Sequence, residues 1–217
     1  MMLGKAMNQD TVSEIGRTGH SSTGSIDYTL FRVINGMAGR SHTLDAVMIA
    51  LAKYSPLVYA VALALLWLTW KPRNQRAALF AGISALVALG LGQIVGYAFP
   101  RDRPYLAHHV SLLITHSPDT SFPSDHTTLA FAVAIAVWQF NRRAAITLLI
   151  FGVLVAVARV FVGAHYPGDV IGGALLGAIT SLIVLRLFEI PVMRRGAERS
   201  FELLGRIRLA SAHDLES

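Results

Sequence analysis

Long apolar runs separated by short polar connections make up most of this chain. Five runs stand out, and they cover about residues 55–70, 77–99, 127–140, 144–163 and 170–190. The second, fourth and fifth runs contain the roughly 20 residues that a helix needs to cross the hydrocarbon core of a bilayer. The first becomes long enough only if it extends back into 44–54, and the third is short because a polar motif precedes it. The pattern predicts an all-α, polytopic transmembrane helical bundle.

The segment 26–54 is ambiguous, because its apolar residues lie near one face of a helix but charged residues interrupt them. The interrupting residues are Arg32, Arg40, Asp45 and Lys53. We interpret the segment as amphipathic interfacial helices that lead into the first span, which gives five spans in total. The alternative is an additional, sixth span. The membrane-embedded domain then covers residues 27–190, between a polar N-terminal tail (1–26) and a charged, cytoplasmic C-terminal tail (191–217).

Composition supports a lipid environment and excludes several kinds of chemistry. Hydrophobic residues make up 53% of the chain and charged residues 15%, whereas a soluble domain carries about a quarter charged residues. The absence of cysteine excludes disulfides, a thiol nucleophile and a thiolate metal site. The net charge of +6 does not indicate a nucleic-acid partner, because the basic residues flank apolar runs and no basic stripe carries interleaved aromatic residues.

The basic residues also predict the orientation of the bundle. They gather between the first and second runs (71–76), between the third and fourth (142–143), and at and after the end of the fifth (186–208). If all five runs span, these three places lie on one side of the membrane, and the positive-inside rule makes that side cytoplasmic. The connections 100–124 and 164–169 then face the exterior.

Nearly all the reactive side chains lie in or beside those two exterior connections. Three stretches stand out: Pro-Arg-Asp-Arg-Pro at 100–104, Ser-Phe-Pro-Ser-Asp-His-Thr at 121–127, and Arg-Val-Phe-Val-Gly-Ala-His-Tyr-Pro-Gly-Asp at 159–169. Alternation of the spans places all three at one membrane face. Each polar residue alone has an ordinary structural explanation. Two arginines, two histidines, a serine and an aspartate that converge on one face nevertheless indicate a functional site.

These residue types suit phosphoryl chemistry. Arg103 and Arg159 each offer a planar cationic fork that matches two phosphate oxygens. Ser124 precedes an apolar helix and is a candidate N-cap, so the free N–H groups of the first turn would face an anion. Asp169, four residues after His165, can accept a hydrogen bond from one ring nitrogen, which leaves the other nitrogen unprotonated and nucleophilic.

At these residues the chain resembles the type 2 phosphatidic acid phosphatase superfamily, which also includes the vanadium haloperoxidases. That family has an Arg-Pro motif, a Pro-Ser-Gly-His motif, and an arginine followed six and ten residues later by histidine and aspartate. The corresponding residues here are 103–104, 123–126 and 159–169. The resemblance covers about residues 31–188, and the spacing of the third motif is highly specific.

The resemblance implies a role for each residue. His165 would be the nucleophile that forms a phosphohistidine, His126 would protonate the leaving oxygen, and Asp169 would orient His165. The phosphoryl oxygens would be held by Arg103, Ser124 and Arg159. The substrate would be a lipid phosphate, and this chemistry needs no metal ion or other cofactor.

Two positions depart from the family pattern. Gly96 stands where the family usually has a lysine, and Arg101 is predicted to supply the lost positive charge to the phosphate. Asp125 replaces the glycine of the second motif. Its backbone N–H is expected to donate to phosphate, with the side chain turned outward.

The sequences Pro-Ser-Asp-His-Thr and His-Tyr-Pro-x-Asp resemble the bacterial undecaprenyl-diphosphatase branch, as in bacitracin-resistance proteins. This favours hydrolysis of undecaprenyl diphosphate to the monophosphate at the exterior face of the bacterial cytoplasmic (inner) membrane. Two alternatives stay open: a phosphatidylglycerophosphate or phosphatidate phosphatase, and a non-catalytic protein that binds or transports a lipid phosphate. The sequence does not indicate the oligomeric state.

Overall fold

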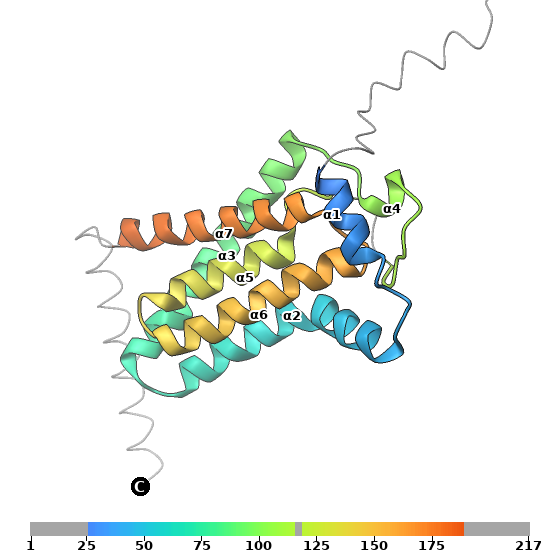
Figure 1. Ribbon diagram of the computed structural model, residues 1–217. Helices are drawn as coiled ribbons and strands as arrows, with labels where there is room; N and C mark the ends of the chain where they lie inside the picture. The colour runs from blue at the N-terminus through green and yellow to red at the C-terminus, as the bar shows by residue number, and fades with distance from the viewer. Residues whose placement is uncertain (1–25, 116–118, 189–217) are drawn as a thin grey trace, which may run out of the picture.

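The computed structural model describes residues 26–115 and 119–188, and every regular element in this part of the chain is a helix (Figure 1). The helices are α1 (Ile26–Asn35), α2 (His42–Leu68), α3 (Pro72–Ala98), α4 (Pro104–Ala107), α5 (Asp125–Trp138), α6 (Arg142–Phe161) and α7 (Pro167–Phe188). The predicted all-α class is confirmed. The predicted tails, apart from Ile26, lie outside the described residues, so the domain boundaries stay predictions.

The five predicted apolar runs correspond to α2, α3, α5, α6 and α7. Four of them, α2, α3, α6 and α7, are long and apolar enough to cross a membrane. Their surfaces carry large apolar side chains that are exposed in the isolated chain, such as Leu65, Leu86, Ile150 and Ile179. Side chains of this kind suit contact with lipid, so the predicted polytopic bundle is confirmed.

α5 is the central helix of the bundle. It has 14 residues, which corresponds to about 21 Å, and is shorter than the hydrocarbon core. Its length need not match the bilayer, because α2, α3, α6 and α7 all pack against it. Small side chains make this close packing possible: Ala130, Val133, Ala134 and Val137 of α5 are all completely buried.

Glycines allow α7 to approach α5 especially closely. A Cβ added at Gly173 would lie 2.5 Å from the carbonyl oxygen of Ser124, and one added at Gly177 would lie 2.2 Å from the carbonyl oxygen of Thr128. These positions have no room for a side chain, as is usual where helices cross closely in a membrane. The contact brings the start of α7 against the start of α5, where two of the polar stretches lie.

The segment 26–54 differs from its interpretation as interfacial helices. Only α1 is separate, and the residues from His42 onward belong to one continuous helix that runs through Pro56 to Leu68. Asp45 is tolerated because it lies in the first turn, where the helix dipole favours an acidic residue. The first span therefore extends back as its length required. α1 has 10 residues and is too short for a sixth span.

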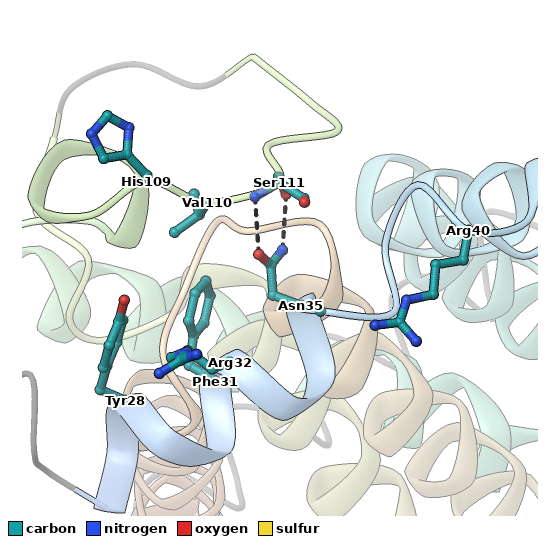
Figure 2. A pocket seen from close by; sticks show the side chains of 9 residues that line it. Tyr28, Phe31, Arg32, Asn35, Arg40, His109, Val110 and Ser111 are labelled. Carbon is teal, nitrogen blue, oxygen red and sulfur yellow. Dashed lines mark hydrogen bonds between the residues drawn. The ribbon is translucent and has the colours of Figure 1, made fainter.

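α1 is amphipathic, as predicted, but it is also anchored to the bundle. Phe31 is buried against Tyr166 in the connection between α6 and α7. The side chain of Asn35 accepts from the N–H of Ser111 at 3.0 Å and donates to its carbonyl oxygen at 2.8 Å (Figure 2). The same amide donates to the carbonyl oxygen of Phe161 at 2.8 Å. α1 thus fastens the connection after α4 to the end of α6.

The connections alternate between the two ends of the bundle. Those between α2 and α3 and between α5 and α6 lie at one end, and α1 and α4 lie at the other (Figure 1). The second end also holds the connection between α6 and α7. The three polar stretches therefore meet at one end, as alternation of the spans predicts.

Substitution of Gly177 tests the packing of α7 on α5. Gly177→Ala should lower the thermal midpoint of the purified protein in detergent, because overpacking of this kind costs about 1–3 kcal/mol. The matched control is Gly90→Ala in α3, where an added Cβ would meet no atom within 4 Å. Unfolding followed by intrinsic fluorescence should separate the two variants. Equal midpoints for both would contradict the close contact.

Candidate active site

His165 lies in the connection between α6 and α7, and its side chain is buried. Its Nδ1 is 2.8 Å from the carbonyl oxygen of Ser121. A carbonyl oxygen can only accept, so Nδ1 carries the proton and Nε2 presents a lone pair. Nε2 lies 3.1 Å from Nη1 of Arg103 and 3.1 Å from Nη2 of Arg159. A potentially nucleophilic nitrogen therefore faces two guanidinium groups.

The pKa of His165 lies well below its ordinary value. Burial is the largest cause, because it disfavours the charged imidazolium, and the charges of Arg159 and Arg103 lower the pKa further. The hydrogen bond to the Ser121 carbonyl raises the pKa, but this effect is smaller. His165 is therefore neutral near pH 7, as a nucleophile must be.

Arg103 is the residue before α4, and its side chain is almost completely buried. Its Nε donates to Oδ1 of Asp119 at 2.8 Å, and its Nη1 donates to the carbonyl oxygen of Ala164 at 3.1 Å. These contacts join the first polar stretch to the residue just before His165. They hold the guanidinium in a fixed position beside the imidazole.

Arg159 lies in the last turn of α6 and is 2% exposed. Its Nη1 donates to the carbonyl oxygen of Ala52 in α2 at 3.4 Å. In a regular helix that carbonyl would accept from the residue four positions later, but Pro56 has no N–H. The proline inside α2 therefore leaves an oxygen that can accept from the guanidinium.

Ser124 is the N-cap residue of α5, as predicted, but its side chain does not cap the helix. Its N–H donates to the carbonyl oxygen of Asp169 at 3.1 Å. Its Oγ is buried and has no hydrogen-bond partner among the described residues. Together with the first N–H groups of α5, which have no acceptor within the helix, this hydroxyl is available to an anion.

His126 and Asp125 occupy the first turn of α5 but lie in different surroundings. His126 and Arg159 line the same cavity of about 520 Å³. The carboxylate of Asp125 accepts two hydrogen bonds of 3.3 Å from the side chain of Gln93 in α3. The side chain of Asp125 is thus directed to α3, while its backbone N–H stays in the first turn.

Asp169 does not contact the ring of His165 in the way expected. Its Oδ2 is 3.9 Å from Nδ1, too far for a hydrogen bond, and the ring nitrogen is paired with the carbonyl of Ser121 instead. Oδ2 accepts from the hydroxyl of Ser121 and from the N–H of Tyr166. Asp169 therefore positions Ser121, which binds the imidazole, and Tyr166, which follows His165 in the chain.

Arg101 has two carboxylates as partners. Its Nη1 is 2.7 Å from Oδ1 of Asp169, and its Nη2 forms an ion pair with Asp27 in the first turn of α1. The guanidinium also lies over the ring of Tyr166, 4.1 Å from the centroid. Asp27 in turn accepts from the N–H of Gly168 at 2.7 Å. The structure thus places Arg101 behind Asp169, not beside Nε2, where a phosphate ligand would be expected.

Position 96 has little space for a side chain. A Cβ added at Gly96 would lie 2.8 Å from Cγ2 of Thr120 and 3.0 Å from the carbonyl oxygen of Phe122. The connection before α5 therefore occupies the space that a residue with a side chain at 96 would need. This agrees with the absence of a lysine there.

A second cavity, of about 600 Å³, lies between α1 and the connection after α4 (Figure 2). It is lined by Tyr28, Phe31, Arg32, Asn35, Gly36, Arg40, His109, Val110 and Ser111. None of these is a predicted site residue, so we place the candidate site at His165. In the described part of the chain, no group of three or more His, Asp or Glu side chains is arranged to hold a metal ion.

The sequence model of the PAP2 superfamily matches residues 77–191, which is more than half of the chain. The chain belongs to the PAP2 superfamily. It is 34% identical over 165 residues to an undecaprenyl-diphosphatase, BcrC, of Bacillus subtilis. The aligned region covers 76% of this chain and 86% of that protein.

Two solved structures have a similar fold. The chain matches the crystal structure of Aquifex aeolicus LpxE with a TM-score of 0.59 and 28% identity, over 75% of this chain and 96% of that one. It matches a transmembrane PAP2 phosphatidylglycerolphosphate phosphatase from Bacillus subtilis with a TM-score of 0.54 and 21% identity, over 78% and 88%. The protein is accordingly a multi-pass membrane PAP2 protein.

Ser121 and Asp27 belong to the surroundings of His165 but were not predicted from the sequence. Ser121 stands at the start of the second polar stretch, where only its proximity to the motif could have drawn attention to it. Asp27 lies 74 residues before its partner Arg101, and no pattern in the sequence connects the two. Ser121 contacts the imidazole of His165 directly through its carbonyl oxygen, whereas Asp27 acts through Arg101 and Gly168.

The low pKa of His165 can be tested through stability. Below pH about 6.5 the unfolded chain binds a proton on this residue that the folded state does not bind, so stability falls by up to about 1.4 kcal/mol per pH unit. The thermal midpoint should therefore fall more steeply from pH 7 to pH 5 in the wild type than in His165→Gln. Parallel curves for the two proteins would contradict a neutral, buried imidazole.

Proposed function

We propose that this protein hydrolyses undecaprenyl diphosphate to undecaprenyl phosphate through a phosphohistidine on His165. The observation that carries the proposal is the unprotonated Nε2 of a buried, neutral imidazole, 3.1 Å from each of two guanidinium groups. A protein that only binds a lipid phosphate needs the arginines but has no need of an oriented nucleophile. The arrangement therefore favours a phosphatase over a docking or transport protein.

The first step is attack by Nε2 on the terminal phosphorus atom. The N–P bond forms as the bond from phosphorus to the bridging oxygen breaks, and His126 donates a proton to that leaving oxygen. Water then attacks the phosphohistidine and gives a proton back to His126. The N–P bond breaks, inorganic phosphate leaves, and His165 returns to its neutral form.

The remaining residues stabilise the charge that develops during the transfer. Arg103 and Arg159 bind the equatorial phosphoryl oxygens, and Ser124 donates from its hydroxyl, which has no other partner in the described part of the chain. The backbone N–H of Asp125 adds a donor from the helix N-terminus. Asp169 and Arg101 act behind the imidazole as positioning residues, because neither contacts Nε2.

The choice of undecaprenyl diphosphate depends on the relatives and on the cavity. BcrC of Bacillus subtilis is named an undecaprenyl-diphosphatase and aligns with three quarters of the chain. The cavity beside His126 has apolar walls from Ile49, Leu113 and Ile114, which suit an isoprenoid chain. The phosphatidylglycerolphosphate phosphatase supports the fold alone, because its identity is 21%. A glycerophospholipid phosphate is therefore the second candidate.

We further infer that the site faces the exterior of the bacterial cytoplasmic (inner) membrane. The opposite end of the bundle carries basic residues at the starts of α3 and α6, namely Arg73, Arg76, Arg142 and Arg143. The positive-inside rule assigns that end to the cytoplasm. The substrate would then be hydrolysed at the outer leaflet.

Loss of the nucleophile should abolish turnover. Phosphate release from undecaprenyl diphosphate by purified His165→Ala should fall by about four powers of ten or more, as for other covalent nucleophiles. Acid-labile phosphate on the quenched protein should disappear as well. Substantial residual hydrolysis would sink the assignment of His165. Faster wild-type release from phosphatidylglycerophosphate would move the substrate to the second candidate.

Single cysteines test the orientation, since the natural chain has none. A cysteine at Ser111 should react with a membrane-impermeant maleimide in intact cells, and one at Arg73 should react only after the membrane is opened. Both positions are exposed in the structure. The reverse pattern would place the site in the cytoplasm and rule out hydrolysis at the outer leaflet.

A further inference from the structure

The cavity beside the candidate site has one cationic side chain that no step above uses. Lys53 of α2 lines the cavity of about 520 Å³ together with Arg159 and His126. Residues 113–115 form another wall. Arg159 also contacts Nε2 of His165, so the cavity begins where the phosphoryl group would be transferred. Whatever remains attached to that phosphoryl group must occupy this space.

Lys53 is unusual for its place in the membrane-spanning helix. It lies about 16 Å along α2 from His42 and about 22 Å from Leu68, at 1.5 Å per residue. A charged residue inside a span is costly, and such residues usually face a cavity with a polar function. Lys53 follows Ala52, whose carbonyl binds Arg159, and this places its backbone beside the candidate site.

The other cations near His165 already have partners. Arg103 and Arg159 contact Nε2, where the transferred phosphoryl group would bind. Arg101 is held by Asp27 and Asp169. A diphosphate carries a second phosphoryl group, and its negative charge increases when the bond to the bridging oxygen breaks. Among the described residues that line the cavity, Lys53 is the basic side chain besides Arg159 and His126.

We propose that Lys53 binds the phosphoryl group that stays on the lipid, and that it makes the site selective for diphosphates over monophosphates. The proposal rests on the function proposed above and adds a second phosphate subsite to it. The ammonium group lies 5.4 Å from the centroid of the Tyr54 ring in the structure. The flexible side chain exchanges this weak contact for a charge-assisted hydrogen bond when a diphosphate binds.

The test compares two inhibitors of phosphate release from undecaprenyl diphosphate. Orthovanadate occupies one phosphoryl position, and methylenediphosphonate occupies two. In Lys53→Gln the inhibition constant for methylenediphosphonate should rise about 10-fold or more, as for a lost hydrogen bond to a charged group. The constant for orthovanadate should change less than about twofold. Lys53→Arg should restore most of the loss.

Lys71→Gln is the matched control, because it removes a lysine at the start of α3, beyond the other end of α2. It should leave both constants unchanged. If Lys53→Gln weakens binding of both inhibitors equally, Lys53 does not bind the second phosphoryl group. If it weakens binding of neither inhibitor, Lys53 does not bind that group either and only extends toward lipid headgroups.

A binding measurement keeps this proposal separate from the function on which it rests. Methylenediphosphonate should raise the thermal midpoint of the wild type more than that of Lys53→Gln, and orthovanadate should raise both equally. Failure of the wild type to hydrolyse undecaprenyl diphosphate would overturn the proposed function. Absence of stabilisation of the wild type by methylenediphosphonate would overturn the second subsite.

Discussion

Two guanidinium groups lie against one buried imidazole at the end of a helical bundle. Most of the polar contacts around them stabilise this arrangement of buried charges. Removing such charges from water costs several kcal/mol per group unless hydrogen bonds replace the lost hydration. Asp119 and the Ala164 carbonyl supply them for Arg103, and the Ala52 carbonyl supplies one for Arg159. The imidazole remains neutral under the same field. An anion bound beside both guanidinium groups would reduce the repulsion between the two cations.

The partners of these groups come from different parts of the chain, so the site depends on the packing of the whole bundle. Small residues let α7 lie close to α5, and the N–H of Ser124 reaches the carbonyl of Asp169 across that contact. α1 contributes Asp27 from one end and Asn35 from the other. The short helix α1 thus holds in place the connection between α6 and α7, which carries the imidazole of His165.

The fold could be predicted largely from the sequence, because apolar runs and their alternation determine which connections share a membrane face. The same argument brought Arg103, Ser124, His126, Arg159, His165 and Asp169 to one end. Alternation of the spans could not predict contacts that depend on the direction of individual side chains. Asp169 was expected to bind the imidazole, but Ser121 intervenes, and Arg101 was expected at the phosphate although two carboxylates hold it. Residues 42–54 were interpreted as interfacial because charged residues interrupt their helical pattern, although the length of the first span required them, and in the structure they belong to α2.

Pro56 shows how a local defect can serve a distant residue. The missing N–H weakens α2 by one hydrogen bond, and the oxygen left over becomes a ligand for Arg159. A residue with an N–H at this position would repair the helix but make Arg159 share that oxygen. The carbonyl oxygen of Ala52 can therefore either complete the hydrogen bonding of α2, which would raise its thermal stability, or hold the side chain of Arg159 in place. Selection for a more stable helix and selection for faster catalysis would act on this position in opposite directions.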